Sequence, residues 1–189
     1  MTLPPLVSER LTLRGWDPDD PQDVAAAYDI YRRDEVSRWL GAHPSPWKSE
    51  QAAHERLLRW QSVGFDAPGF GIWAIVPTGG DGPIGSALLT RLPDSEGTLT
   101  EDVEIGWHLH PDHWGHGYAT EAAVLLMAHA DETLGITKIN ALAYPGNDAS
   151  VAVMQRLGMH HRGETDRWYG VHLQWWSTPL ELAAETGPA

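Results

Sequence analysis

The sequence contains no cysteine and no apolar run close to the roughly 20 residues that a membrane-spanning helix needs. The lack of cysteine excludes disulfides, thiolate metal ligands and a cysteine nucleophile, and it fits a reducing compartment. The first residues also lack the basic segment followed by an apolar stretch that marks a secretory signal. We therefore expect a cytoplasmic protein with no membrane partner.

Basic residues are scarce as well, since 13 lysines and arginines stand against 26 acidic residues and give a formal net charge of −13. Such a charge disfavours nucleic acid as a partner. It would attract a cationic ligand, although solubility is the commoner reason for it. With 189 residues, 42% of them hydrophobic, and no repeat or linker, the chain suits one domain over residues 1–189, with a flexible tail from about residue 183.

Residues 103–121 change their periodicity in the middle. In the first half apolar residues alternate with others, as in a half-buried strand that puts Glu104 on the face opposite the core. In the second half apolar residues recur at the spacing of an amphipathic helix. The chain must therefore turn sharply between the two halves, in a loop that contains Gly115 and Gly117.

These two glycines permit backbone angles that a Cβ would forbid, and they let the main chain approach a ligand closely. They precede a helix start, where unpaired N–H groups and roughly half a positive charge favour an anion such as a pyrophosphate. An isolated Gly-x-Gly pair is equally compatible with a plain connection between a strand and a helix. The surrounding residues must decide between the two interpretations.

Residues 114–122, Trp-Gly-His-Gly-Tyr-Ala-Thr-Glu-Ala, resemble the acyl-CoA-binding motif of the GNAT superfamily of N-acetyltransferases, which runs Gln/Arg-x-x-Gly-x-Gly/Ala. Gly117 and Ala119 take the two small positions. Trp114 departs from the usual Gln/Arg, but the run is similar to the branch that includes the ribosomal-protein N-terminal acetyltransferases. Two further segments resemble the family in the right order, Glu-Arg-Leu-Thr-Leu-Arg at residues 9–14 and the Asn-x-x-Ser to Leu-Gly-Met stretch at residues 147–159.

Periodicity and turn residues indicate the remaining elements. We expect strands over residues 6–14, 70–76, 84–92, 137–144, 159–165 and 171–182. We expect four helices: one capped by Asp20 that starts at Pro21, one started by Ser49 with Glu50 that ends at Gly64, one after Gly117 that ends near Gly135, and one after Asn147. The resemblance implies an α/β (α+β) fold. It consists of a mixed, mostly antiparallel sheet of about seven strands flanked by about four helices, with two central parallel strands splayed at the cofactor site.

The resemblance also implies acetyl-CoA as co-substrate and direct transfer of its acetyl group to a primary amine in a ternary complex. Glu104 matches the acidic position of the family's Glu-Ile-Gly-Tyr pattern and is the expected general base. Many relatives carry a tyrosine proton donor where this chain has Met154, so Ser150, a water or Tyr144 is expected to protonate the CoA thiolate. The expected cofactor-binding residues are Trp107, His108, Leu109, Trp114, Gly115, His116, Gly117, Tyr118, Ala119, Thr120, Asn147 and Ser150. A β-bulge over residues 107–109 is expected to aim a main-chain N–H group at the thioester.

Each of these assignments has a plainer alternative. Glu104 can be a surface residue of a strand, and Asn147 and Ser150 can serve only to pair the free N–H groups at a helix start. His108, His110, His113 and His116 crowd the central loop and suggest zinc. No histidine–carboxylate helix motif accompanies them, so we expect no metal.

Other functions are compatible with parts of the sequence. The Gly115-x-Gly117 pair also suggests a nicotinamide-dependent oxidoreductase, but Thr120 stands where a third glycine is needed. A non-catalytic acyl-CoA sensor and a longer acyl donor such as succinyl-CoA both stay open. No motif encodes the acceptor, which can be a protein N-terminus or a small cationic amine, and the protein is expected to be a monomer or a homodimer.

Overall fold

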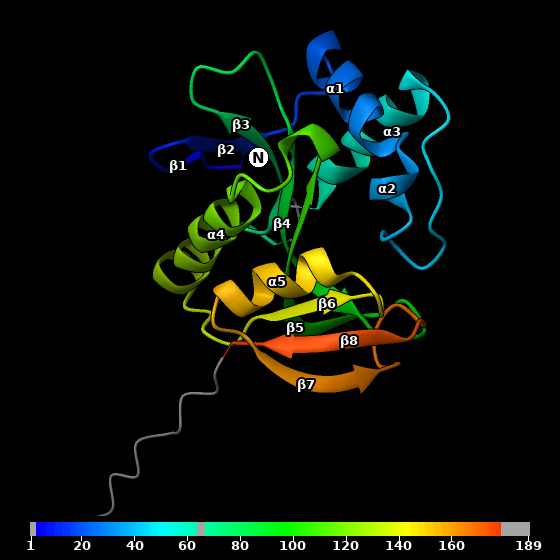
Figure 1. The fold of residues 1–189 in the computed structure, drawn as a ribbon, viewed down its shortest axis with the longest axis vertical. Helices are drawn as coiled ribbons and strands as arrows, with labels where there is room; N and C mark the ends of the chain where they lie inside the picture. Colours follow the sequence, from blue (N-terminus) through cyan, green and yellow to red (C-terminus); the bar gives the residue numbers. More distant parts are fainter. Residues whose placement is uncertain (1–2, 64–66, 179–189) are drawn as a thin grey trace, which may run out of the picture.

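The computed structural model describes residues 3–63 and 67–178. The strands of this part are β1 (Leu6–Val7), β2 (Leu11–Gly15), β3 (Gly71–Pro77), β4 (Gly85–Pro93), β5 (Leu99–Leu109), β6 (Asn140–Ala143), β7 (His160–Thr165) and β8 (Leu173–Ser177). The helices are α1 (Pro21–Tyr31), α2 (Asp34–Ser37), α3 (Glu50–Ser62), the short 3-10 helix η1 (Pro111–His113), α4 (Tyr118–Leu134) and α5 (Asp148–Arg156). Figure 1 shows how they surround one sheet.

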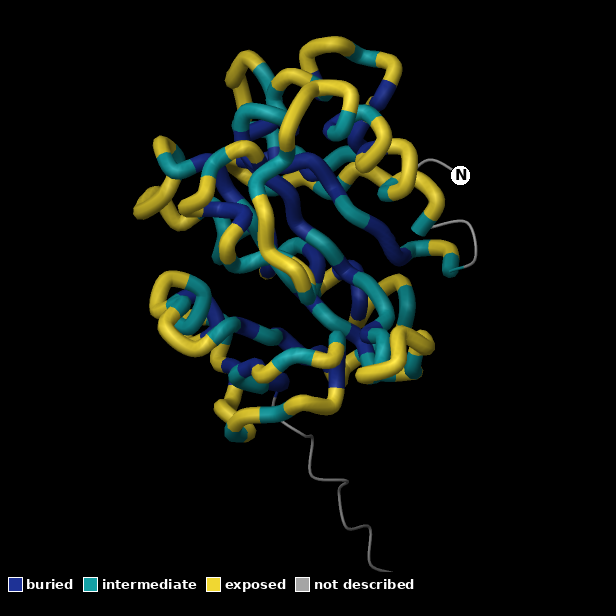
Figure 2. The backbone as a smooth tube through the Cα atoms, turned by 90° about the vertical axis from the view of Figure 1, so that its right-hand side faces the viewer, coloured by how far each residue is buried: buried dark blue, intermediate teal, exposed yellow. Residues whose placement is uncertain are grey.

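The eight strands lie in the order β1-β2-β3-β4-β5-β6-β8-β7. Among the described strands, β5 and β6 are the one parallel pair of neighbours, and they register at a single position, where Glu104 lies opposite Asn140. Every other adjacent pair is antiparallel. Beyond Glu104 the two parallel strands separate, so the sheet consists of a part formed by β1–β5 and a part formed by β6–β8 (Figure 2).

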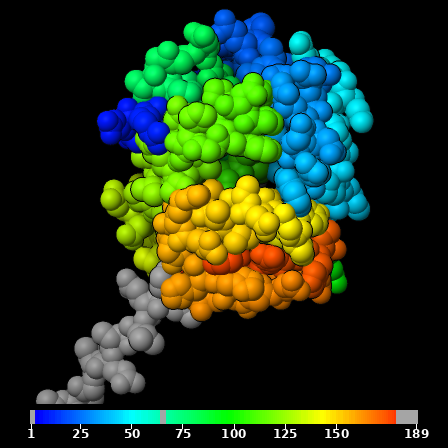
Figure 3. All heavy atoms as spheres, viewed as in Figure 1, coloured from blue at the N-terminus to red at the C-terminus, as the bar shows by residue number. Residues whose placement is uncertain are grey.

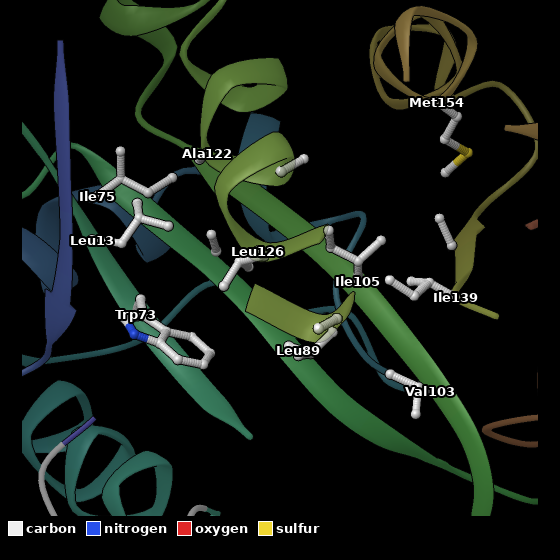
Figure 4. Packing of buried hydrophobic residues seen from close by; sticks show 14 of the residues in the cluster. Leu13, Trp73, Ile75, Leu89, Val103, Ile105, Ala122, Leu126, Ile139 and Met154 are labelled. Carbon is white, nitrogen blue, oxygen red and sulfur yellow. The ribbon is translucent and has the colours of Figure 1, made fainter. Parts of the chain in front are cut away.

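The two faces of the sheet are covered by different helices. On one face, apolar side chains from the central strands pack against α4 and α5, and Figure 4 shows Val103, Ile105 and Leu126 within this core. On the other face, α1 and α3 pack through a second cluster that includes Tyr31 and Leu57. The alternation of β5 therefore directs Val103 and Ile105 toward α4 and leaves Glu104 on the side of α1, as its period predicted.

Most helix boundaries follow the predicted caps. The Asp20 side chain accepts a hydrogen bond from the Gln22 N–H at 2.9 Å and starts α1 at Pro21, and the Ser49 side chain accepts from the Ala52 N–H at 3.2 Å and starts α3. Gly135, at φ 67°, ends α4. The mixed sheet of the predicted fold is confirmed, with one strand and one helix more than expected within the described residues.

The extra elements have local causes. The single strand predicted over residues 6–14 is a hairpin of β1 and β2, because the Ser8 N–H donates to the Leu11 carbonyl at 2.9 Å and turns the chain there. The short helix α2 carries no sequence signal of its own. The strand predicted from residue 137 begins only at Asn140. The predicted helix end at Gly64 and the strand residues 179–182 lie outside the described residues.

No helix within residues 3–63 and 67–178 is both long enough and apolar enough to cross a bilayer.

Asn140 holds the parallel strands together at their one point of register. Its side-chain amide is buried, donates to the Val103 carbonyl at 3.0 Å and accepts from the Trp175 indole N–H at 2.9 Å. One side chain therefore joins β5, β6 and β8 at the position from which β5 and β6 diverge.

Replacing this amide should destabilise the protein more than a surface amide does. We expect Asn140→Ala to lower the free energy of unfolding by about 2–4 kcal/mol, because two polar groups lose their partner inside the protein. Urea denaturation followed by tryptophan fluorescence measures the change. Gln51→Ala is the control, since the Gln51 amide bonds only the exposed Glu55, at 3.0 Å, and should cost less than about 0.5 kcal/mol. Equal losses in the two variants would show that Asn140 does not hold the strands.

Candidate active site

A cleft of about 810 Å³ opens where β5 and β6 diverge. Its walls come from β5, the loop before α4, the first turn of α4, the end of β6 and the start of α5, and from the segment around α2. In the space-filling view of Figure 3, the surface over α5 meets the surfaces over α4 and over the first helices, which are the elements that line the cleft. Elements far apart in the sequence thus line one hollow.

The loop between β5 and α4 forms one end of the cleft. Gly115 and Gly117 have φ angles of 78° and 81°, a left-handed conformation that glycine adopts without strain, and α4 starts directly after Gly117. The first N–H groups of α4 have no partner within the helix, so this end suits an anion. The Trp114 indole N–H donates to the Leu109 carbonyl at 2.9 Å and fixes the loop to the end of β5.

The structure brings nearly all the predicted cofactor-binding residues to this cleft. Eleven of them line it, namely Trp107, His108, Leu109, Trp114, Gly115, Gly117, Tyr118, Ala119, Thr120, Asn147 and Ser150. His116 is not among the lining residues: it is exposed, its Nδ1 lies 2.9 Å from the Trp114 carbonyl, and its ring stacks on Tyr118. The backbone of His116 remains part of the loop.

The main chain of β5 presents N–H groups to the cleft. The Val103 carbonyl bonds Asn140 on the β6 side, whereas the His110 N–H donates to the Ile84 carbonyl on the β4 side at 2.8 Å. Because successive residues of a strand alternate, the N–H groups of Ile105, Trp107 and Leu109 face the β6 side. The N–H of Trp107 therefore points into the space that the divergence opens.

The predicted bulge over residues 107–109 is wrong. Strand β5 pairs with β4 in unbroken register from Leu109 opposite Gly85 to Val103 opposite Arg91, and the one shift in this pairing lies between Arg91 and Pro93. The divergence of β6 exposes the N–H groups of β5 by itself, so a bulge is not needed to free them.

Glu104 lies in the wall of the cleft, next to the point of divergence. Its Oε2 accepts a hydrogen bond from the Tyr169 hydroxyl at 2.5 Å. Burial raises the pKa of Glu104 from 4.5 to about 7, and the bond from Tyr169 opposes part of this rise. The carboxyl is therefore divided between its two protonation states near neutral pH, where a proton acceptor of this kind works best.

Sequence reasoning missed Tyr169, which lies between the expected strands over residues 159–165 and 171–182. Tyr169 is the one non-glycine residue with positive φ, at 59°, in the described part of the chain. The segment is anchored on the β4–β5 hairpin: Trp168 bridges to Asp94, and the Tyr169 N–H donates to the Pro93 carbonyl at 3.4 Å. Burial, together with Glu104, raises the pKa of Tyr169, so its hydroxyl stays a donor. Tyr169 and Glu104 are 65 positions apart in the sequence, so their contact leaves no local signal there.

The start of α5 forms the opposite wall. Asn147 caps this helix, because its side chain accepts from the Ser150 N–H at 3.3 Å, and both residues line the cleft. Tyr144 also lines it, but its hydroxyl donates to the Gly41 carbonyl at 2.8 Å, and burial raises its pKa. Met154, which stands where many relatives carry a tyrosine, is buried.

His108 extends from β5 on the same side as Glu104. Its Nδ1 lies 3.3 Å from the Tyr31 hydroxyl, which donates to Ser86 Oγ at 2.7 Å, and the Trp16 indole N–H donates to the same oxygen at 3.1 Å. Burial lowers the pKa of His108 to about 4, so the ring is neutral at physiological pH. It therefore adds a neutral polar group, held by buried neighbours, to the wall of the cleft.

The four histidines that suggested zinc do not converge on one point. His108 contacts Tyr31, and the Nε2 atom of His110 lies 3.1 Å from an Asp29 oxygen. The His113 ring lies edge-on to that of His110, with ring centres 6.0 Å apart, and His116 stacks on Tyr118. In the part of the chain that the structure describes, no group of three or more histidine, aspartate or glutamate residues is arranged to hold a metal ion.

The two parallel strands diverge at a cleft that is also lined by the glycine loop before α4 and by Glu104. An acetyltransferase (GNAT) domain model matches residues 10–160, and the chain belongs to this family. Members of the family use acetyl-CoA as the acetyl donor, and the protein is an acyl-CoA-dependent N-acetyltransferase.

Similar proteins agree with this assignment. The chain is 27% identical over 158 residues to the uncharacterized N-acetyltransferase p20 of Bacillus licheniformis, a match that covers 84% of this chain and 83% of p20. It is similar to the crystal structure of an acetyltransferase from Agrobacterium tumefaciens, with a TM-score of 0.75 and 27% identity over 95% of this chain and 96% of that one.

Two further matches are local. One covers 35% of this chain and 38% of the uncharacterized protein YkkB of Bacillus subtilis, at 38% identity. The other covers 50% of this chain and 40% of the FsC-acetyl coenzyme A-N(2)-transacetylase of Aspergillus fumigatus, at 34% identity.

From the raised pKa of Glu104 we predict how the free energy of unfolding depends on pH. Glu104 binds its proton more tightly in the folded than in the unfolded chain, so its stabilising contribution is complete below pH 4.5 and is lost as the pH rises through about 7. Glu104→Gln stays neutral, and its free energy of unfolding relative to the wild type should therefore rise between pH 4.5 and 8, by up to about 3 kcal/mol. Urea denaturation at several pH values measures it.

Glu101→Gln is the control on the same strand. Glu101 is exposed, and a hydrogen bond and an ion pair with Arg91 lower its pKa, so this variant should show no such rise. A flat difference between Glu104→Gln and the wild type would contradict the raised pKa.

Proposed function

We propose that the protein transfers an acetyl group from acetyl-CoA to an α-amino group, with Glu104 as the general base. The observation that carries the proposal is the position of this carboxyl, which has a pKa of about 7 and lies in the cleft beside the diverging strands. The proposal treats residues 1–189 as one domain that contains the whole site.

The cleft fits a long, anionic thioester. Gly115 and Gly117 have open space where a Cβ would lie, apart from one contact of Gly117 with Arg10 at 3.6 Å, so a phosphate group can approach their main chain. We assign the pyrophosphate of CoA to this loop and the pantetheine arm to the gap between β5 and β6, near Asn147. When bound, acetyl-CoA supplies an activated acetyl thioester.

The chain's own residues supply the rest of the chemistry. The Glu104 carboxylate takes a proton from the acceptor amine, directly or through a water, while Tyr169 holds the Oε2 atom and leaves the other oxygen free. The Trp107 N–H, on the cleft side of β5, is placed to donate to a carbonyl oxygen. These two groups come from the same strand, with Glu104 at the last point of register with β6 and Trp107 beyond it.

We assign the proton donor for the departing thiolate to the Ser150 hydroxyl, with a water as the alternative. Ser150 lines the cleft, and its N–H donates to the side chain of Asn147. Because the Asn147 side chain caps the helix, the Ser150 hydroxyl is not needed as the cap and is available to donate a proton. Tyr144 can serve only if it releases the Gly41 carbonyl, to which it donates at 2.8 Å. This makes Tyr144 the weaker candidate.

The pKa of Glu104 favours one class of acceptor. An α-amino group has a pKa of about 7.7–8.0, whereas an alkylamine such as a lysine side chain has one of about 10.4. Moving a proton from an α-ammonium group to a carboxylate with a pKa of about 7 therefore costs about 1 kcal/mol, against more than 4 kcal/mol for an alkylammonium group. Apolar residues such as Val36, Leu40 and Leu88 line the cleft and suit an apolar group beside the amine.

A peptide N-terminus meets both conditions, and it agrees with the resemblance of residues 114–122 to the branch that includes the ribosomal-protein N-terminal acetyltransferases. A small-molecule amine is the second candidate, and the local match to the FsC-acetyl coenzyme A-N(2)-transacetylase leaves it in place, because the name of that protein refers to an N(2) position and not to a peptide N-terminus. A non-catalytic acyl-CoA sensor and a longer acyl donor are the remaining alternatives.

The first experiment is thermal unfolding with acetyl-CoA, with succinyl-CoA, NAD and zinc in parallel. At about a hundred times its dissociation constant, a ligand adds about 2.7 kcal/mol, which raises the midpoint by several degrees. We expect acetyl-CoA to give the largest shift. A shift with NAD or zinc alone would contradict the assignment of the loop.

Replacing Glu104 should lower turnover but leave the affinity for the acetyl donor unchanged. We expect Glu104→Gln to reduce kcat/KM by about 10²–10⁴-fold, with the Kd of CoA within about twofold of the wild type. Release of CoA thiol with a panel of N-terminal peptides, polyamines and small amines measures turnover, and calorimetry measures Kd. Wild-type kcat/KM should also rise with pH through about 7, and in Glu104→Gln the rise should follow the pKa of the acceptor amine, about 7.7–8.0, instead.

Glu101→Gln on the same strand is the matched control and should keep wild-type turnover. Unchanged turnover in Glu104→Gln would remove Glu104 from the mechanism, and equal rates with alkylamines and peptides would contradict the acceptor class.

A further inference from the structure

The turn between β1 and β2 contacts the first turn of α4 through one carboxylate. Glu121 accepts hydrogen bonds from the Ser8 hydroxyl at 2.7 Å, from the Arg10 N–H at 3.2 Å and from Arg10 Nε at 2.7 Å, and it forms an ion pair with Arg10 Nη2. These donors all come from one turn of the chain, 111 residues or more before Glu121. The β1–β2 hairpin, which the sequence did not predict, makes this contact possible.

Arg10 also contacts the glycine loop itself. Its Nη1 donates to the His116 carbonyl at 3.0 Å, and its guanidinium lies 5.0 Å from the centre of the Tyr118 ring. Arg10 thus contacts the residues on both sides of Gly117. Neither Arg10 nor Glu121 is among the residues that line the cleft, and Arg10 Nη2 lies 3.6 Å from the position that a Cβ of Gly117 would take.

The negative charge of Glu121 is stabilised by Arg10. Burial opposes ionisation of Glu121, but hydrogen bonds from Ser8 and Arg10 hold its pKa below its usual 4.5, so it is negatively charged at neutral pH. A carboxylate in the first turn of α4 gains from the helix dipole, but it repels a phosphate group bound at the same helix start. The guanidinium of Arg10 balances this charge.

We propose that Arg10 is a positioning residue for the pyrophosphate of CoA, acting through its contacts with the His116 carbonyl and with Glu121. By binding the His116 carbonyl it keeps this oxygen turned out of the cleft, so that the neighbouring N–H groups face the ligand. By pairing with Glu121 it removes a repulsive charge from the phosphate site. The inference rests on the proposed binding of CoA at the loop, and it goes beyond it by adding two residues that line no part of the cleft.

Calorimetry with CoA on the full chain tests the proposal. We expect Arg10→Ala to weaken CoA binding about tenfold, equivalent to about 1.4 kcal/mol, while kcat at saturating acetyl-CoA stays within about twofold. Adding Glu121→Gln to Arg10→Ala should recover at least about threefold of the loss, because the unbalanced carboxylate is then gone. Arg10→Lys keeps the charge but loses the fork of donors, and it should give an intermediate Kd.

Arg91→Ala is the matched control. It breaks another arginine–glutamate ion pair, between Arg91 and Glu101, outside the residues that line the cleft, and should leave Kd unchanged. Circular dichroism and the Tm of each variant establish that it is folded.

The outcomes separate this inference from the proposed function. Failure of the wild type to bind CoA would overturn the proposed function. A wild type that binds CoA and an Arg10→Ala variant that binds it equally well would overturn the role of Arg10 alone. A loss that Glu121→Gln does not reduce would also overturn it, because a direct contact of Arg10 with phosphate gives that result.

Discussion

The single point of register between β5 and β6 is the constraint on which the site depends. Parallel neighbours normally continue side by side, but here the ladder consists of Glu104 opposite Asn140, and beyond it the strands diverge. The buried amide of Asn140 pairs main chain of β5 with the indole of Trp175 on β8, so the divergence starts from a fixed place. The space between the strands, the N–H groups of β5 that face it and the carboxyl beside it all follow from this geometry.

The chemistry of the site comes from the two faces of one strand and from its edge. The apolar face of β5 packs on α4 and fixes the strand, while the other face holds Glu104 and His108 among buried neighbours that shift their pKa values in opposite directions. Both shifts favour the neutral form, because burial penalises charge whichever sign it has. The cleft therefore has a carboxyl that titrates near neutral pH and a histidine that stays uncharged.

The sequence predicted what local patterns determine. The caps at Asp20 and Ser49, the helix end at Gly135 and the glycine loop before α4 depend on neighbours within a few residues, and the structure has all of them. The break between β1 and β2 depends on hydrogen bonds between Ser8 and Leu11, which hydrophobic periodicity does not reveal. The bond between Tyr169 and Glu104 and the contacts of Arg10 depend on tertiary packing, so no pattern within the sequence could have indicated them.

The bond from the Tyr144 hydroxyl to the Gly41 carbonyl links the two parts of the molecule on either side of the cleft. It joins the end of β6 to the segment after α2, and Tyr144 and Gly41 both line the hollow. A neutral hydrogen bond of this kind contributes only about 1 kcal/mol net, which corresponds to a population ratio of about five to one. Thermal motion alone therefore breaks this bond in an appreciable fraction of molecules, and a ligand that fills the cleft can displace it at little energetic cost.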